Sequence, residues 1–228
     1  MKKRVVVLSG AGISAESGLE TFRDSNGLWA KYRIEDVCTP EALRNNPGKV
    51  LDFYNMRRRQ LLKVVPNDAH KALVELERHF TVDIVTQNVD DLHERAGSSS
   101  VLHLHGELFK CRSIKNPQLI VETKGDVNIG DLAPDGTQLR PHIVFFGEEV
   151  PELERGAKIV SLADIFIVVG TSLAVYPAAG LVNYVQSQVP CFLVDPSEVK
   201  PSYRMFEHIK KRASAGLPEL CSLLISNF

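Results

Sequence analysis

The sequence predicts an α/β fold, a doubly wound, Rossmann-like parallel sheet with a small inserted lobe. Short, largely apolar runs, typical of strands buried on both faces, recur at residues 5–8, 82–85, 165–169 and 191–194. Amphipathic stretches lie between these runs, and alternation of strands with helices indicates a parallel sheet. The region 110–139 instead contains repeated turn signals, such as Pro134-Asp135-Gly136, and predicts a small irregular lobe.

The first run is followed by a glycine loop, and the helices have recognisable start signals. Thr39 is a candidate N-cap, because Pro40 suits the first position of a helix. Further helices are expected over about 47–64, after Asn67-Asp68 with Leu73, Leu76 and Phe80 on one stripe, and from Pro177 toward Gln186.

Length and composition favour one large domain with a smaller lobe. The chain has 228 residues, and 44% of them are apolar, enough for a substantial core. We assign residues 1–30, 65–109 and 140–228 to the large domain. Residues 31–64 and 110–139 then form the small lobe.

Several classes of partner are not favoured. The formal net charge of −1 does not favour binding to nucleic acid, and no apolar stretch approaches the roughly 20 residues of a membrane span. The apolar run at 5–8 is too short for a secretory signal. The four cysteines form no C-x-x-C pair, which suits a reducing cytosol. We therefore expect a cytoplasmic protein with neither nucleic-acid nor membrane partners.

The glycine loop after the first strand has the form of a dinucleotide-binding turn. Its G-x-G-x-x-[GA] positions are occupied by Gly10, Ala11, Gly12 and Ala15. A plain tight turn is the alternative interpretation. The acidic residue expected about 20 positions later in dehydrogenases is missing, since residues 22–27 resemble a loop. NAD would therefore not bind here as it does in an ordinary dehydrogenase.

Six ordered segments together strongly resemble the sirtuin family of NAD-dependent protein deacylases. They are G-A-G-I-S-A-E-S-G-L-E-T-F-R (10–23), T-Q-N-V-D-D-L-H-E-R-A-G (86–97), H-L-H-G-E-L (103–108), R-P-H-I-V-F-F-G-E (140–148), G-T-S-L (170–173) and Y-P-A-A-G (176–180). The resemblance covers nearly the whole chain. It is nearest to the class III bacterial branch, which is desuccinylase- and demalonylase-like.

This resemblance implies a cleft between the domains where NAD and an acyl-lysine protein or peptide meet. The family transfers the acyl group to the ADP-ribose of NAD, giving nicotinamide and O-acyl-ADP-ribose. For this chain it implies removal of acetyl groups and of succinyl or malonyl groups. Protein ADP-ribosyltransferase or NAD glycohydrolase activity is an open alternative, as is a non-catalytic NAD-sensing or protein-binding module.

By resemblance, His105 is the catalytic base, and histidine titrates in the range that such a base needs. Asn88 and Gln87 hold the nicotinamide ribose and Asp90 the carboxamide. Helix capping is the alternative role for Asn88 and Asp90, although Asp91 fits that role better than Asp90 does. His103 is interpreted as structural.

The resemblance also assigns the remaining NAD contacts. Phe22 shields the labile ribosyl centre, and Arg23 contacts phosphate or ribose. Phosphates or the adenine ribose lie against Gly170, Thr171 and Ser172. Asp195 stands where the family has asparagine, and its carboxylate would repel a 2′-phosphate, favouring NAD over NADP.

The expected substrate contacts form two groups. Tyr54 and Arg57 are three residues apart on a predicted helix and share a face, as does the family's pair that holds an acyl carboxylate. A solvated Arg57-Arg58-Arg59 face is the alternative. Cys38 occupies a position that is usually alanine in this branch. The edge that pairs with the peptide backbone comprises Val144, Phe145, Phe146 and Gly147.

One feature of most sirtuins is missing. Two C-x-x-C pairs usually make a structural zinc site, but only Cys111 is present in this region. We predict no structural zinc and no other metal. The lobe is then expected to be held by the packing of apolar residues, Leu119, Ile120, Val121 and Leu132.

Overall fold

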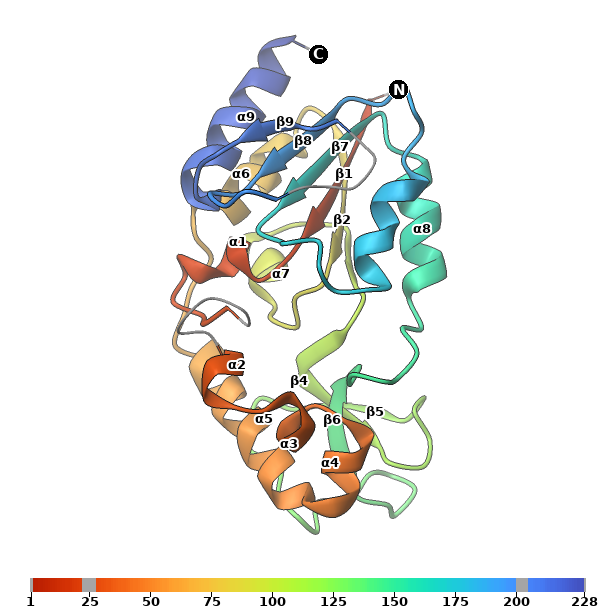
Figure 1. Ribbon diagram of the computed structural model, residues 1–228. Helices are drawn as coiled ribbons and strands as arrows, with labels where there is room; N and C mark the ends of the chain where they lie inside the picture. The colour runs from red at the N-terminus through yellow and green to blue at the C-terminus, as the bar shows by residue number, and fades with distance from the viewer. Residues whose placement is uncertain (1, 22–27, 200–204, 228) are drawn as a thin grey trace.

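The computed structural model describes residues 2–21, 28–199 and 205–227. Its upper half in Figure 1 is a six-stranded sheet with the order β3-β2-β1-β7-β8-β9 and parallel pairing throughout. The strands are β1 (Arg4–Ser9), β2 (Thr81–Thr86), β3 (Val101–His103), β7 (Ile165–Val169), β8 (Cys191–Val194) and β9 (Glu207–Ile209). All four predicted strands are confirmed within one residue at each end.

Helices cover both faces of this sheet, because alternate residues of each strand point to opposite sides. Val5 and Val7 belong to one apolar core, which includes residues of α6 (Asp68–Leu76) and α9 (Ala213–Asn227). Val6 and Leu8 belong to the other, beneath α8 (Leu153–Ser161) and the 3₁₀ helix η1 (Ala178–Tyr184). The doubly wound prediction is thereby confirmed.

The chain builds a second part below the sheet (Figure 1). Its helices are α2 (Leu28–Lys31), α3 (Ile34–Val37), α4 (Pro40–Asn45) and α5 (Pro47–Leu61). Beside them a three-stranded antiparallel sheet has the order β5-β4-β6, with β4 (Gly106–Ser113), β5 (Ile120–Glu122) and β6 (Leu139–Ile143). The expectation of a purely irregular lobe was therefore wrong, because β5 is short and mostly exposed and gives little apolar signal.

The predicted helices differ from the structure mainly at their ends. Thr39 caps α4 as expected, since its Oγ1 accepts the Ala42 N–H at 3.0 Å. The helix expected over 47–64 ends at Leu61, and the one expected from Pro177 is the 3₁₀ helix η1. Two short helices, α1 (Gly12–Ala15) and α7 (Leu92–Ala96), follow β1 and β2. None of the helices among residues 2–21, 28–199 and 205–227 is long and apolar enough to cross a membrane.

The core of the small sheet also differs from prediction. Ile120 and Leu132 are 45% and 58% exposed, so they do not hold the lobe together. Val121 packs inward, as alternation along an edge strand requires. The buried cluster that it contacts comprises Leu51, Cys111, Val127, Ala133 and Leu139.

A buried arginine links the helices of this part to its strands and loops. Arg58 of α5 is fully buried, and its guanidinium donates to the carbonyls of Gly125 (3.0 Å) and Leu108 (3.4 Å) and to Asn55 Oδ1. Asn55 in turn exchanges two hydrogen bonds with the backbone of Val127, at 2.9 and 3.0 Å. These bonds give the buried side chains of Asn55 and Arg58 hydrogen-bond partners.

Candidate active site

The register of the parallel sheet brings the predicted motifs to one edge. Ser9, the last residue of β1, pairs with Thr86 of β2 and with Val169 of β7. Thr86 pairs with His103, and Val169 pairs with Val194. The segments that begin at residues 10, 87, 104, 170 and 195 therefore leave the sheet together, at the carboxyl edge where α/β proteins bind ligands.

A cavity of about 650 Å³ lies at this edge, within the size range of ligand sites. Its lining at the sheet edge includes Gly10, Ala11, Gly12, Ala15, Gln87, Asn88, His105, Gly170, Thr171, Ser172 and Asp195. Its lining below the edge includes Cys38, Tyr54, Arg57, Val144, Phe145, Phe146 and Gly147. Phe22 and Arg23 lie outside the described residues.

The two glycine-containing loops cross in van der Waals contact. Gly10 and Gly12 donate their N–H groups to the carbonyls of Val169 (3.0 Å) and Gly170 (2.8 Å). A Cβ on Gly10 would lie 2.7 Å from the Gly170 oxygen, and Gly170 itself has φ +61°. Glycine at these positions is therefore required by the crossing of the loops, and the N–H groups of Gly10 and Gly12 are already used in it.

His105 is oriented by one backbone hydrogen bond. Its Nδ1 lies 3.1 Å from the carbonyl of Gln87, which can only accept, so Nδ1 carries the hydrogen and Nε2 is the basic nitrogen. Burial lowers the pKa of His105, and the Gln87 carbonyl opposes this shift. The ring is therefore a neutral base at pH 7.

Asn88 is held at three of its polar groups. Its N–H donates to Thr86 Oγ1 (3.0 Å), and its carbonyl accepts from His103 Nδ1 (2.8 Å). Its Nδ2 donates to Ser14 Oγ (3.2 Å). Ser14 was not among the predicted site residues, although it lies inside the glycine motif and is almost fully buried. The histidine assigned a structural role thus fixes the backbone of the predicted ribose-binding residue.

Asp90 lies beside the cavity rather than in its wall, alone among the predicted cofactor residues that the structure describes. It is buried, and its Oδ1 accepts the Leu92 N–H at 3.2 Å. Burial raises the pKa of its carboxyl. The capping expectation for Asp91 was wrong: Asp91 occupies the N-cap position of α7, but its side chain makes no capping bond. Asp90, one residue earlier, accepts the N–H of Leu92, the first residue of α7.

The lower part of the cavity has an aromatic wall. Tyr54 is buried, stacks on Phe145 (ring centroids 5.8 Å, 18° between planes) and meets Phe53 edge-on (5.1 Å). Its hydroxyl donates to Cys38 Sγ at 3.2 Å. Arg57, one helical turn further along α5, is also buried, and burial lowers its pKa. The solvated-face alternative for Arg57 is therefore wrong, although Arg59 is exposed to solvent as that alternative expected.

A partly buried ion pair fixes the backbone turn that follows β6. Arg140 Nη1 and Nη2 donate to the two carboxylate oxygens of Glu148 at 2.6 and 3.1 Å. Glu148 Oε2 also accepts the Phe145 N–H at 2.8 Å, and the Arg140 guanidinium lies 4.1 Å from the centroid of the Phe145 ring. The pair therefore supports both the turn and the aromatic wall, and the Arg140 partner holds the Glu148 pKa below its usual range despite burial.

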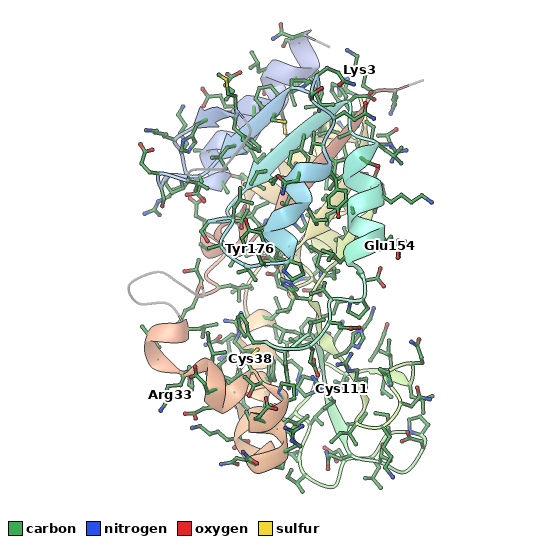
Figure 2. All side chains as sticks on the ribbon, turned by 45° about the vertical axis from the view of Figure 1, so that its right-hand side comes forward. Lys3, Arg33, Cys38, Cys111, Glu154 and Tyr176 are labelled. Atoms are coloured by element: carbon green, nitrogen blue, oxygen red, sulfur yellow. The ribbon has the colours of Figure 1, made fainter. Side chains whose placement is uncertain are left out.

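The cavity also includes residues that the sequence did not single out. Tyr176 and Pro177 belong to a recognised motif, whereas Glu198 and Arg212 had no distinguishing signal. Figure 2 shows Tyr176 on the sheet-bearing part and Cys38 on the helical part below it. Elsewhere, residues 2–21, 28–199 and 205–227 contain no group of three His, Cys, Asp or Glu side chains able to hold a metal ion.

Comparison with known proteins identifies the family. A model of the Sir2 family matches residues 10–177. An NAD-dependent protein deacylase of Bacteroides thetaiotaomicron is 54% identical over 230 residues, covering 98% of each chain. A Sir2 homologue solved with NAD has a TM-score of 0.86 and 38% identity, covering 99% of this chain and 90% of its own. A Sir2 protein bound to an acetylated peptide has a TM-score of 0.78 and 28% identity, with 99% and 93% covered. As its six motifs predicted, this chain belongs to the Sir2 family, the sirtuins.

Proposed function

We propose that this protein is an NAD-dependent protein-lysine deacylase that removes acetyl groups and also acidic acyl groups, succinyl or malonyl. The observation that carries the proposal is the shared cavity. One wall holds a neutral imidazole, His105, beside Asn88, and the other holds Tyr54 and Arg57. The Bacteroides thetaiotaomicron protein that is similar over nearly the whole chain is an NAD-dependent protein deacylase, which supports this proposal.

The lining at the sheet edge suits NAD. The cavity runs from Asn88 and His105, across the crossed glycine loops, to Asp195 at the end of β8. Asp195 Oδ1 accepts the Ser197 N–H at 2.8 Å, and its carboxylate can also accept ribose hydroxyl groups while disfavouring a 2′-phosphate. Bound NAD supplies an ADP-ribose that takes up the acyl group, with nicotinamide as the leaving group.

The protein contributes positioning and one proton acceptor. His105 Nε2 takes a proton from a hydroxyl group of the bound ribose, and the Gln87 carbonyl keeps the ring in the tautomer that can do so. Asn88, fixed by Thr86, Ser14 and His103, orients that ribose. Preorganised groups of this kind lower the barrier without moving during the reaction.

The lower wall accounts for the acyl preference. An acyl-lysine that enters beside Phe145 and Phe146 places the end of its acyl chain near Tyr54 and Arg57. Arginine can bind a carboxylate through two hydrogen bonds, and the tyrosine hydroxyl can add a third. The guanidinium of Arg57 attracts a carboxylate, so an acidic acyl group fits this wall better than a neutral one of the same length.

An acyl-peptide panel tests the proposal. Acetyl- and succinyl-lysine peptides are incubated with NAD and wild-type, Arg57→Met or His105→Ala protein, and free lysine peptide is measured by mass spectrometry. We expect His105→Ala to lose turnover of both peptides and Arg57→Met to lose mainly the succinyl reaction. If the wild type turned over neither peptide, the proposal would be refuted. A succinyl rate unaffected by Arg57→Met would remove the acidic-acyl assignment.

A further inference from the structure

The acyl pocket contains a hydrogen bond between two of its own wall residues. The Tyr54 hydroxyl donates to Cys38 Sγ at 3.2 Å, and both side chains line the cavity while being only 4% and 7% exposed. A tyrosine hydroxyl has a single proton to donate. While that proton points at the sulfur, it does not point at a ligand in the cavity.

The ring that carries this hydroxyl cannot move far. Phe145 stacks on one face of Tyr54, and Phe53 packs against it edge-on at 5.1 Å. The Arg140–Glu148 ion pair holds Phe145 in turn. Rotation about the C–O bond is therefore the freedom left to the hydroxyl, and it decides whether Cys38 or a bound acyl group receives the proton.

The backbone that carries the sulfur is also held, because Cys38 is hydrogen-bonded on both sides. Its N–H donates to the Ile34 carbonyl at 2.9 Å, and its carbonyl accepts the Phe146 N–H at 3.0 Å. Any side chain at this position keeps both bonds. Burial raises the pKa of the Cys38 thiol, so it stays protonated and acts as a weak, neutral acceptor.

We propose that the Tyr54–Cys38 hydrogen bond sets acyl specificity by restraining the Tyr54 proton and so reducing the preference for acidic over acetyl groups. An acidic acyl group must draw this proton away from the sulfur to gain its tyrosine bond, whereas an acetyl group leaves it in place. The inference rests on the proposed function, in particular on Tyr54 and Arg57 receiving the acyl carboxylate. It makes Cys38 a specificity-determining residue for that reaction.

Two substitutions at one position separate this idea from a simple effect of size. The measured quantity is the ratio of kcat/KM for a succinyl-lysine peptide to kcat/KM for the matched acetyl-lysine peptide. Cys38→Ala removes the acceptor and is expected to raise the ratio about three- to tenfold, as loss of one competing neutral hydrogen bond predicts. Cys38→Ser supplies a stronger oxygen acceptor and is expected to lower the ratio below that of the wild type.

The hydrogen bond therefore predicts the order Ala, Cys, Ser from highest to lowest ratio. Side-chain volume alone predicts Ala, Ser, Cys. As a matched control, the same substitutions are made together with Tyr54→Phe, where no hydroxyl remains and the three ratios are expected to agree within twofold. Because each value is a ratio within one protein preparation, partial loss of folded protein cancels.

Any other order overturns the inference, as does an undiminished effect of Cys38→Ala in the Tyr54→Phe background. These results differ from failure of the proposed function. If the wild type turns over neither peptide, the deacylase proposal fails. If it turns over only the acetyl peptide, the acidic-acyl assignment fails and this inference with it. If both peptides react and the Cys38 series is flat, only the role of Cys38 is refuted.

Discussion

At the scale of single residues, neighbouring hydrogen bonds decide what each site residue can do. The carbonyl of Gln87 forces the hydrogen of His105 onto Nδ1 and leaves Nε2 basic. Asn88 donates to Thr86 Oγ1 and Ser14 Oγ, and its carbonyl accepts from His103 Nδ1. The motif letters indicated which residues converge, but these bonds depend on side chains from distant segments and could not be predicted from them.

The protonation of His105 predicts how activity depends on pH. Burial lowers its pKa below the ordinary value of 6.5, so the ring becomes a competent base as pH rises through that lowered pKa. We expect kcat/KM for an acetyl-lysine peptide to rise with pH and to reach its plateau by about pH 7.5. A pH–rate profile from pH 5 to 9 measures this. An acidic limb centred above pH 6.5 would contradict the assignment.

At the scale of secondary-structure elements, the turn after β6 shows how an element end is held for function. Glu148 receives Arg140 through both carboxylate oxygens and the Phe145 N–H through one of them. The motif predicted that this edge meets the peptide. It did not predict the ion pair, because Arg140 and Glu148 are eight residues apart and meet only when the chain turns back.

Loss of this ion pair should weaken binding of the acyl peptide more than binding of NAD. Glu148→Gln leaves Arg140 buried without its carboxylate and frees the 145–148 turn, so we expect KM for the acyl peptide to rise about tenfold or more. KM for NAD should change less than twofold. Steady-state kinetics with each substrate varied measures the split.

A comparable ion pair elsewhere provides the control for Glu148→Gln. Arg4 of β1 pairs with Asp83 of β2, whose side chain is 13% exposed, within the upper sheet. Asp83→Asn removes a similar half-buried charge, and KM for the peptide should stay within twofold of the wild type. Equal changes in both Michaelis constants for Glu148→Gln would indicate a general disturbance of the cavity rather than positioning of the peptide.

Helix α5 contributes a buried arginine, Arg58, to the stability of the lower part. Arg58→Met leaves the buried carbonyl of Leu108 without its donor and also removes the bonds to Asn55 and Gly125. A buried polar group left without its partner costs about 1–3 kcal/mol. We expect unfolding in urea to be easier by at least about 2 kcal/mol. Adjacent Arg59 pairs with Asp126 at the surface, so Arg59→Met should cost less than about 1 kcal/mol.

Metal analysis complements that comparison. We expect purified wild-type protein to contain no stoichiometric zinc and its unfolding midpoint to be unchanged by a chelator. One zinc per chain, lost together with stability on chelation, would contradict this. In the urea experiment, equal losses of unfolding free energy in Arg58→Met and Arg59→Met would contradict the role given to the buried Arg58 guanidinium.

At the scale of the whole molecule, the sequence predicted the buried central strands better than the edge strand, the last helix and the small sheet. The runs at 165–169 and 191–194 match β7 and β8 at both ends, because a strand buried on two faces is apolar throughout. Edge strand β9 has the sequence Glu-His-Ile, which gives no such signal. Helix α9 carries apolar residues on most sides and contains Pro218, so its periodicity is weak. The small antiparallel sheet was missed because β5 is short and mostly exposed, and because β6 lies far from its partner β4 in sequence.

Buried histidines link the stability of the whole fold to pH. His70 of α6 is fully buried, and desolvation lowers its pKa from 6.5 to about 4. The unfolded chain therefore binds more protons than the folded chain between these values, and stability falls as pH falls from 6.5 to 4. The loss attributable to His70 is about 3 kcal/mol, and burial of His93 acts in the same direction.

Urea unfolding at several pH values checks this linkage. The free energy of unfolding should decrease from pH 7 to pH 4.5, and His70→Gln should make that decrease smaller while lowering stability at pH 7. A variant whose pH dependence is as steep as that of the wild type would show that other groups cause the loss.

The central claim is that one cavity couples NAD cleavage to removal of an acyl group from lysine. The most direct test is the stoichiometry of products from acetyl-lysine peptide and NAD, followed by mass spectrometry. We expect equal amounts of free lysine peptide, nicotinamide and O-acetyl-ADP-ribose from the wild type and none of the three from His105→Ala. Nicotinamide released with ADP-ribose free or attached to protein, while the acetyl peptide stays intact, would contradict it.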